Sequence, residues 1–228
     1  MKRRAIAVVL AACSSCGLAK SAPFAWRLTV EEPDGRVAEA TSAAPRADVD
    51  VSLDAVETAD GWTVTGCVAN KGKGTVTAFE GPIFKGLAVD KARSGLNVPD
   101  GFGRRVSSFA AAAGPKRPSG WKPVGDGEFR YETANYPGRQ LAMPWVALDD
   151  GKSGASVMVL DPVARTKRFM CRYCPARDTA AVAPVHSIFL RPGETWTLPA
   201  VSFARYAGDW HVAARKYRAW YDTVRKTD

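Results

Sequence analysis

The chain has 228 residues, of which 46% are hydrophobic and 24% charged, and its formal net charge at pH 7 is +9. This length and apolar content suit one large domain with a substantial core. Lysine and arginine are scattered along the sequence rather than concentrated in one stripe. We therefore exclude nucleic acid as a partner and attribute the charge to a solvated basic face.

The first twelve residues have the pattern of an export signal. Three basic residues, Lys2 to Arg4, precede an apolar run from Ala5 to Ala12. This run is too short to cross a bilayer, which requires about 20 apolar residues. We therefore expect an exported protein.

Cys13 directly follows the apolar run. The segment Leu10-Ala11-Ala12-Cys13 resembles a bacterial lipobox, in which the cysteine is acylated before cleavage on its amino side. The resemblance implies a signal peptide at 1–12, a flexible tether at 13–23, and a lipoprotein held in the membrane, on its periplasmic or cell-surface side, by lipidation of Cys13. The alternative is an ordinary secretory signal cleaved after Ser21, which would give a secreted protein.

Short alternating segments separated by turn residues begin at Phe24. Residues 26–30 predict a strand, residues 48–53 and 61–68 predict a hairpin, and residues 75–79 predict a further strand. Similar signals return at 140–148, 155–160, 182–190 and 195–203. Regularly spaced short strands of this kind indicate an all-β sandwich or barrel.

Residues 91–138 are rich in Gly, Pro, Ser and Lys and show few periodic signals, which indicates a mobile segment or a binding loop. Trp121 lies within this segment, and Trp145 follows Met143-Pro144. Loops often carry ligand contacts, so we select Trp121 and Trp145 as candidate carbohydrate-binding residues. The alternative for both is packing in the core or at an edge.

The last segment changes its period. Its apolar residues are spaced by three and four, which predicts an amphipathic helix with Asp209 as its N-cap. These residues are Trp210, Ala213, Ala214, Tyr217, Trp220, Tyr221 and Val224. We assign Trp210 and Trp220 to packing of this helix against another surface.

Cys171 and Cys174 form the only closely spaced cysteine pair after the signal region. In an oxidising compartment we expect a structural disulfide, either within this pair or from one member to Cys67, with free thiols as the alternative. Zinc would need two more ligands, and the chain has only His186 and His211 as histidines. We therefore expect no metal and no cofactor.

Four stretches carry a resemblance to a known family. They are Phe79-Glu80-Gly81-Pro82-Ile83 leading to Pro99-Asp100-Gly101-Phe102-Gly103; Tyr136-Pro137-Gly138 leading to Met143-Pro144-Trp145-Val146-Ala147-Leu148; 154–162 with Lys167 beyond; and Gly208-Asp209-Trp210 with Ala213-Ala214, Tyr217-Arg218 and Trp220. In this order they resemble the amino-terminal β-sandwich of bacterial glycosidase-like proteins with the layout of alpha-glucosidases and alpha-galactosidases.

The resemblance implies a fold and a missing part. It implies a large antiparallel β-sandwich, supersandwich-like, over residues 24–207, followed at 208–228 by a helix that links it to a (β/α)8 barrel. In such proteins the barrel holds the catalytic carboxylates, and we expect that barrel to be missing here.

The carboxylates of this chain do not suggest catalysis. Glycoside hydrolysis needs two carboxyl groups facing each other across the sugar. Asp149, Asp150 and Asp161 are available, but Asp149-Asp150-Gly151 is typical of a turn at a strand end, where side chains point into water. We therefore expect no catalytic residues in this chain.

The preferred function is a non-catalytic, carbohydrate-associated module of an exported glycoside-hydrolase-like lipoprotein. Its partners would be an oligosaccharide or polysaccharide and a separate barrel domain or protein docking on the terminal helix. The alternative is a structural or protein-interaction lipoprotein of the cell envelope without sugar binding. An enzyme that uses the cysteine pair or an acidic cluster is the third reading.

Overall fold

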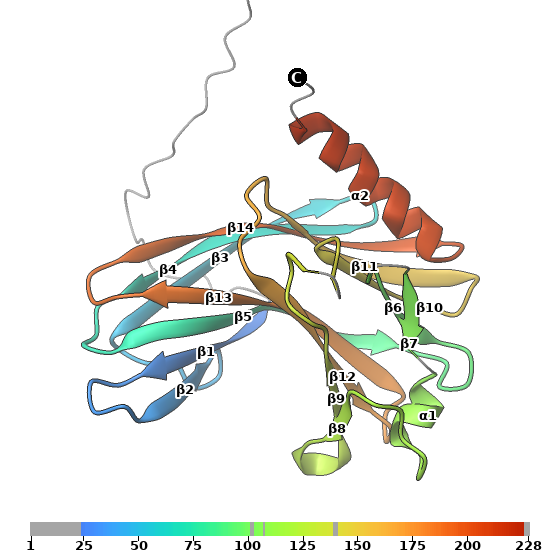
Figure 1. Ribbon diagram of the computed structural model, residues 1–228, viewed down its shortest axis with the longest axis horizontal. Coiled ribbons are helices and arrows are strands. Elements are labelled where there is room, and N and C mark those ends of the chain that lie inside the picture. The colour runs from blue at the N-terminus through green and yellow to red at the C-terminus, as the bar shows by residue number, and fades with distance from the viewer. Residues whose placement is uncertain (1–23, 101–102, 107, 139–140, 226–228) are drawn as a thin grey trace, which may run out of the picture.

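The computed structural model describes residues 24–100, 103–106, 108–138 and 141–225. The predicted signal peptide, Cys13 and the tether lie outside these residues. Within them, two seven-stranded antiparallel sheets pack face to face, and one long helix covers part of an outer face (Figure 1). The prediction of a large antiparallel β-sandwich with a C-terminal helix is confirmed.

Each sheet combines strands that are distant in sequence. Sheet A contains, in spatial order, β2 (Val37–Thr41), β1 (Ala25–Glu31), β5 (Thr75–Ala88), β13 (Thr179–Leu190), β12 (Lys167–Cys174), β9 (Phe129–Glu132) and β8 (Trp121–Pro123). Sheet B contains β3 (Val49–Thr58), β4 (Gly61–Asn70), β14 (Thr195–Ala207), β11 (Ser153–Leu160), β10 (Trp145–Asp149), β6 (Gly95–Val98) and β7 (Arg104–Val106).

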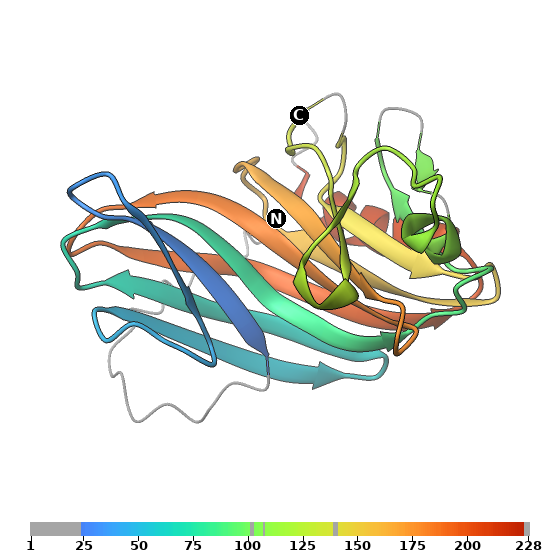
Figure 2. The same cartoon turned by 90° about the horizontal axis from the view of Figure 1, so that it is seen from below.

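Alternating side chains build the core between the sheets. In β1, Trp26, Leu28 and Val30 are buried, while the residues between them are only half-buried. This period of two is the natural consequence of a pleated strand with one face on the core. Figure 2 shows the long strands of the two sheets stacked across the molecule.

The hairpin predicted at 48–53 and 61–68 is confirmed, because β3 pairs with β4 in antiparallel register from Val49 opposite Asn70 to Thr58 opposite Gly61. The strands predicted at 155–160, 182–190 and 195–203 lie within β11, β13 and β14.

The expectation that residues 91–138 lack regular structure is wrong. This segment contains β6, β7, β8 and β9, together with α1 (Phe109–Ala113) and the short 3-10 helix η1 (Gly125–Gly127). These strands have only three or four residues, which is too short for a sequence period to be visible. Tertiary pairing with longer strands defines them instead.

The helix α2 (Trp210–Val224) begins as predicted. The Asp209 side chain accepts a hydrogen bond from the backbone N–H of His211, which caps the helix. Tyr217 and Ala213 are buried against Trp145 and Met158 on the outer face of sheet B, and Trp210 and Trp220 pack at the edge of this cluster. The assignment of these two tryptophans to helix packing is confirmed. No helix among the described residues is long and apolar enough to cross a membrane.

A buried ion pair joins the two sheets where the chain crosses from β11 to β12. Lys167 Nζ lies 2.9 Å from Asp161 Oδ2, and neither side chain is exposed. Asp161 also accepts hydrogen bonds from Arg165 and from the backbone N–H of Val163. The Lys167 ammonium lies 5.1 Å from the ring centroid of Tyr136. These contacts satisfy the buried charges, which would otherwise be costly.

Candidate functional site

The two tryptophans selected from the sequence are core residues. Trp121 is 4% exposed and packs against Phe109 and Tyr131, while Trp145 is 1% exposed and stacks near Trp210. A sugar stacks only on a ring face that is open to solvent. The selection of Trp121 and Trp145 as binding platforms is therefore corrected to a packing role.

The expected disulfide is absent. Cys171 and Cys174 are free thiols, both buried, on the same strand β12. Residues three apart in a strand point to opposite faces and lie about 10 Å apart, too far for a disulfide. Cys171 faces the core, where burial raises the pKa of its thiol above the usual range, and Cys174 lies on the outer face.

The candidate carboxylates have structural contacts. The expectation that Asp149 points into water is wrong: its side chain is fully buried and accepts hydrogen bonds from Asn97 and Arg105. Asp150 accepts hydrogen bonds from the backbone N–H groups of Lys152 and Ser153, which closes the turn. Together with the ion-paired Asp161, these residues stabilise loops.

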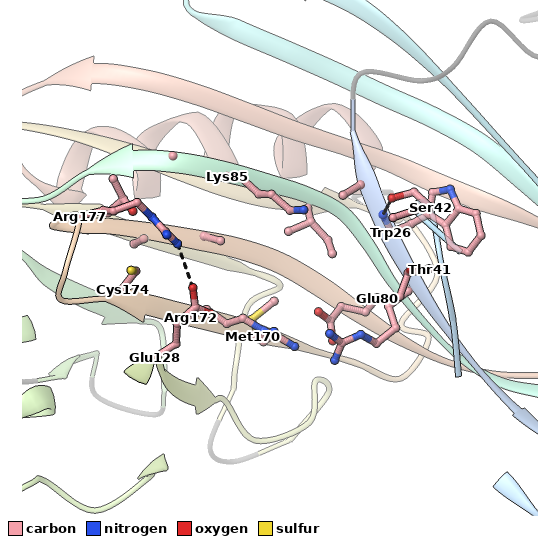
Figure 3. Close-up of a pocket in the computed structure, with 18 residues that line it drawn as sticks. Trp26, Thr41, Ser42, Glu80, Lys85, Glu128, Met170, Arg172, Cys174 and Arg177 are labelled. Carbon is pink, nitrogen blue, oxygen red and sulfur yellow. Dashed lines mark hydrogen bonds and ion pairs between the residues drawn. The ribbon is translucent and has the colours of Figure 1, made fainter. Parts of the chain in front are cut away.

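A hollow of about 530 Å³ on the outer face of sheet A is the best candidate site (Figure 3). This volume is in the range that holds small ligands. Strands β1, β5, β12 and β13 contribute to its lining, together with residues 41–43 at the end of β2 and Glu128 beside η1. The charged lining residues are Arg27, Glu80, Lys85, Glu128, Arg172 and Arg177.

Strand alternation positions the charged side chains. On β12, Phe169, Cys171 and Tyr173 belong to the core, so Met170 and Arg172 lie on the opposite, outer face. The same rule places Arg27 outside on β1, between the core residues Trp26 and Leu28. The outer face of these strands therefore carries charged side chains, while the alternate residues, which face the core, are apolar.

The carboxylates of the hollow already have cationic partners. Glu80 Oε2 lies 3.2 Å from Arg130 Nη2, and the Glu80 side chain is only 6% exposed. Arg130 also contacts Glu132, which in turn binds Arg168, so a chain of alternating charges runs along the outer face. At the other side of the hollow, Glu128 Oε1 lies 3.2 Å from Arg177 Nη2 (Figure 3).

Arg172 differs from these arginines. It is half-buried, and within the described residues it forms no ion pair, while its Nε atom is buried without a hydrogen-bond partner. Burial lowers the pKa of Arg172, and the neighbouring Arg27 lowers it further. The Nε atom of Arg27 is likewise buried without a hydrogen-bond partner, although it lies 3.8 Å from Glu39 Oε2 in an ion pair.

The lining combines these charges with apolar groups. Ile83 and Met170 line the hollow and belong to a small apolar cluster with Ala183 and Val185 on the same outer face. Guanidinium groups donate hydrogen bonds in fixed directions, and the apolar groups can contact C–H surfaces. Among the described residues there is no group of three or more His, Cys, Asp or Glu side chains that could hold a metal ion. The arrangement is suited to binding a small ligand that has both hydrogen-bond acceptors and C–H surfaces.

Sequence reasoning missed this site because its residues come from distant positions. Arg27, Glu80, Arg130 and Arg172 are each isolated in the sequence, and the basic residues looked scattered. The one local signal is on β12, where Arg168 and Arg172 occupy outward positions among the apolar residues that follow Lys167. Only strand pairing shows that these charges meet.

Comparison with solved structures identifies the fold. The alpha-N-acetylgalactosaminidase NagBb from Bifidobacterium bifidum, in complex with GalNAc, matches with a TM-score of 0.52 and 13% identity over 86% of this chain and 33% of that chain. The GH36 alpha-galactosidase AgaA from Geobacillus stearothermophilus matches with a TM-score of 0.43 and 11% identity over 86% and 32%. The Slr1438 protein from Synechocystis sp. PCC 6803 matches with a TM-score of 0.45 and 11% identity over 81% and 61%. No protein-family model and no curated relative matches the sequence.

The match to NagBb supports the resemblance at the level of fold. The chain is a β-sandwich similar to a part of a glycoside hydrolase chain, and it spans about a third of the length of NagBb. At 13% identity the likeness concerns the fold alone, so an activity does not transfer with it.

Proposed function

We propose that this protein is a non-catalytic carbohydrate-binding module whose site is the hollow on the outer face of sheet A. The observation that supports this most is the combination of several arginines with an apolar floor in one concavity of ligand size. Sugars present hydroxyl groups at their edges and C–H groups on their faces. A surface of guanidinium and aliphatic groups matches both.

The same lining argues against hydrolysis in the hollow. The mechanism of a glycosidase requires one carboxylic acid that donates a proton and one free carboxylate. Glu80 and Glu128 each contact an arginine, and Glu80 is almost completely buried. Both carboxylates line the hollow, but each is bound to a guanidinium group and neither is a free carboxylate.

Filling the hollow should weaken glycan binding. Ala181 lines the hollow on β13, so Ala181→Trp would occupy its volume without removing a charge. We expect glycans that bind the unaltered protein on an array to lose at least about tenfold in affinity, or about 1.4 kcal/mol. Titration of the purified protein by calorimetry measures the loss.

The matched control is Val37→Trp, which adds the same ring at an exposed position of sheet A that does not line the hollow. This variant should bind like the unaltered protein. Equal binding by both variants would place the glycan site elsewhere, and silence of the unaltered protein across a broad glycan set would contradict the proposed function.

We also propose that the protein is exported and anchored through Cys13, because the sequence before it has the order of a lipoprotein signal. When it is produced in a bacterium that processes lipoproteins, the protein should partition with membranes, and Cys13→Ser should move it to the soluble fraction. Cys67→Ser is the control because Cys67 lies within the sandwich on β4. Membrane association of Cys13→Ser would contradict the lipid anchor.

A second candidate is a protein-interaction lipoprotein of the cell envelope. It is favoured by Tyr221 and Val224, which are 41% and 38% exposed near the end of α2. A separate barrel domain or another envelope protein would then dock on this end of the helix. This alternative predicts a stable complex with an envelope protein and no glycan affinity.

A further inference from the structure

We propose that the saccharide bound in the hollow carries an oxyanion group, a carboxylate or a sulfate, and that Arg172 is the residue that binds it. This inference rests on the proposed function and specifies its ligand class. It follows from the register of the strands around Arg172, from its lack of a carboxylate partner and from the charges that line the hollow.

Two arginines face each other across the β9–β12 pair. Arg172 is the direct cross-strand partner of Arg130, and on its other side it is the partner of Ala181. Like charges in directly opposed positions destabilise a sheet. Neither directly opposed position supplies a carboxylate to Arg172, and although Glu80 and Glu128 are near enough to raise its pKa, neither forms an ion pair with it.

The nearby carboxylates are already engaged. Arg130 contacts Glu80 and Glu132, and Arg177 contacts Glu128. The lining of the hollow has four cationic and two anionic side chains, so it keeps a formal excess of positive charge. An anionic ligand group would balance this excess.

The donors of Arg172 are suited to an oxyanion. Its Nε atom is buried and has no hydrogen-bond partner, and the guanidinium offers several donors in one plane. Carboxylate and sulfate oxygens accept such donors in pairs. Arg27, whose Nε atom also lacks a hydrogen-bond partner and is 3.8 Å from Glu39, lines the same hollow and adds a second positive charge.

The decisive comparison uses pairs of ligands that differ only in the anionic group. We would titrate the purified protein with oligogalacturonate and its carboxyl-reduced form, with a sulfated galactan oligosaccharide and its desulfated form, and with inorganic sulfate. We expect at least one charged oligosaccharide to bind at least about tenfold more tightly than its neutral form. Arg172→Met should remove this difference.

The matched control is Arg168→Met. Arg168 lies on the same strand and the same outer face, but it pairs with Glu132 and does not line the hollow. Its variant should keep the affinity for the charged ligand within about twofold. A loss at Arg168 equal to that at Arg172 would overturn the assignment of Arg172.

The remaining outcomes separate the two proposals. Equal binding of neutral and charged oligosaccharides would overturn the oxyanion inference but support a glycan module. Sulfate alone binding as tightly as the sulfated oligosaccharide would support the oxyanion site and contradict the carbohydrate function. Absence of all binding would overturn both.

A stability measurement distinguishes a ligand-binding arginine from a structural one. Without ligand, Arg172→Glu would place a carboxylate opposite Arg130 and should raise Tm by about 2 °C at low salt. The same variant should not bind the charged oligosaccharide. A lower Tm for both Arg172→Glu and Arg172→Met would show that Arg172 has a structural role and overturn the inference.

Discussion

Replacing Lys167 with methionine should lower the free energy of unfolding by about 3–5 kcal/mol, because the change leaves the buried carboxylate of Asp161 without its fully buried cation. Neither side chain of this pair is exposed to water. The pair lies where the chain passes from β11 in sheet B to β12 in sheet A, so the loss acts on the connection between the sheets. Urea denaturation followed by tryptophan fluorescence measures the effect.

Arg165→Met is the matched control for this prediction. Arg165 contacts the other oxygen of the same carboxylate at 2.8 Å, but its side chain is 50% exposed. Solvent screens an exposed pair, so this variant should cost less than about 1 kcal/mol. Similar losses for both variants would show that burial of Lys167 is not what makes the pair important.

These buried polar contacts show what the sequence resemblance detects. Lys167 and Asp161 come from the third stretch, and the backbone of Lys167 pairs with Tyr136 from the second. Trp145 from the second stretch stacks near Trp210 from the fourth. The stretches therefore mark contacts that hold the sheets, loops and helix together, which explains why they indicate a fold rather than an activity.

The fold could be predicted where local chemistry determines structure. The hairpin of β3 and β4 alternates with period two, and α2 has both its apolar spacing and its cap at Asp209. The segment around β6 to β9 could not be predicted, since strands of three or four residues depend on partners elsewhere in the chain. The glycines and prolines of this segment suggested a loop, because the pairing that makes its short strands is not visible in the sequence.

The site could not be predicted because its chemistry depends on strand order. Arg172 lies opposite Arg130 on one neighbouring strand and opposite Ala181 on the other, so neither directly opposed residue is a carboxylate. The sequence provides none of this register. Conversely, Trp121 and Trp145 suggested sugar binding in the sequence, but both rings are apolar enough to pack in the core and are buried in the structure.

Acidification from pH 6.5 to pH 5 should lower the free energy of unfolding by on the order of 2 kcal/mol through His186 alone. Burial, together with the nearby positive charges of Lys167 and Arg165, lowers the pKa of His186 from 6.5 to about 3. Between these values the unfolded chain binds a proton that the folded protein excludes. Stability from this group is therefore complete above pH 6.5 and is lost progressively as the pH falls toward 3.

Replacement of each histidine separately tests this origin, because the chain has only two. His186 is 2% exposed and packs near the rings of Phe79 and Trp196, and its Nε2 atom has no hydrogen-bond partner. His186→Leu should flatten the dependence of unfolding free energy on pH between 6.5 and 5, whereas His211→Leu, at the exposed start of α2, should retain it. An unchanged slope in His186→Leu would mean that other groups bind the proton, and that the core tolerates a charged imidazole opposite Lys167.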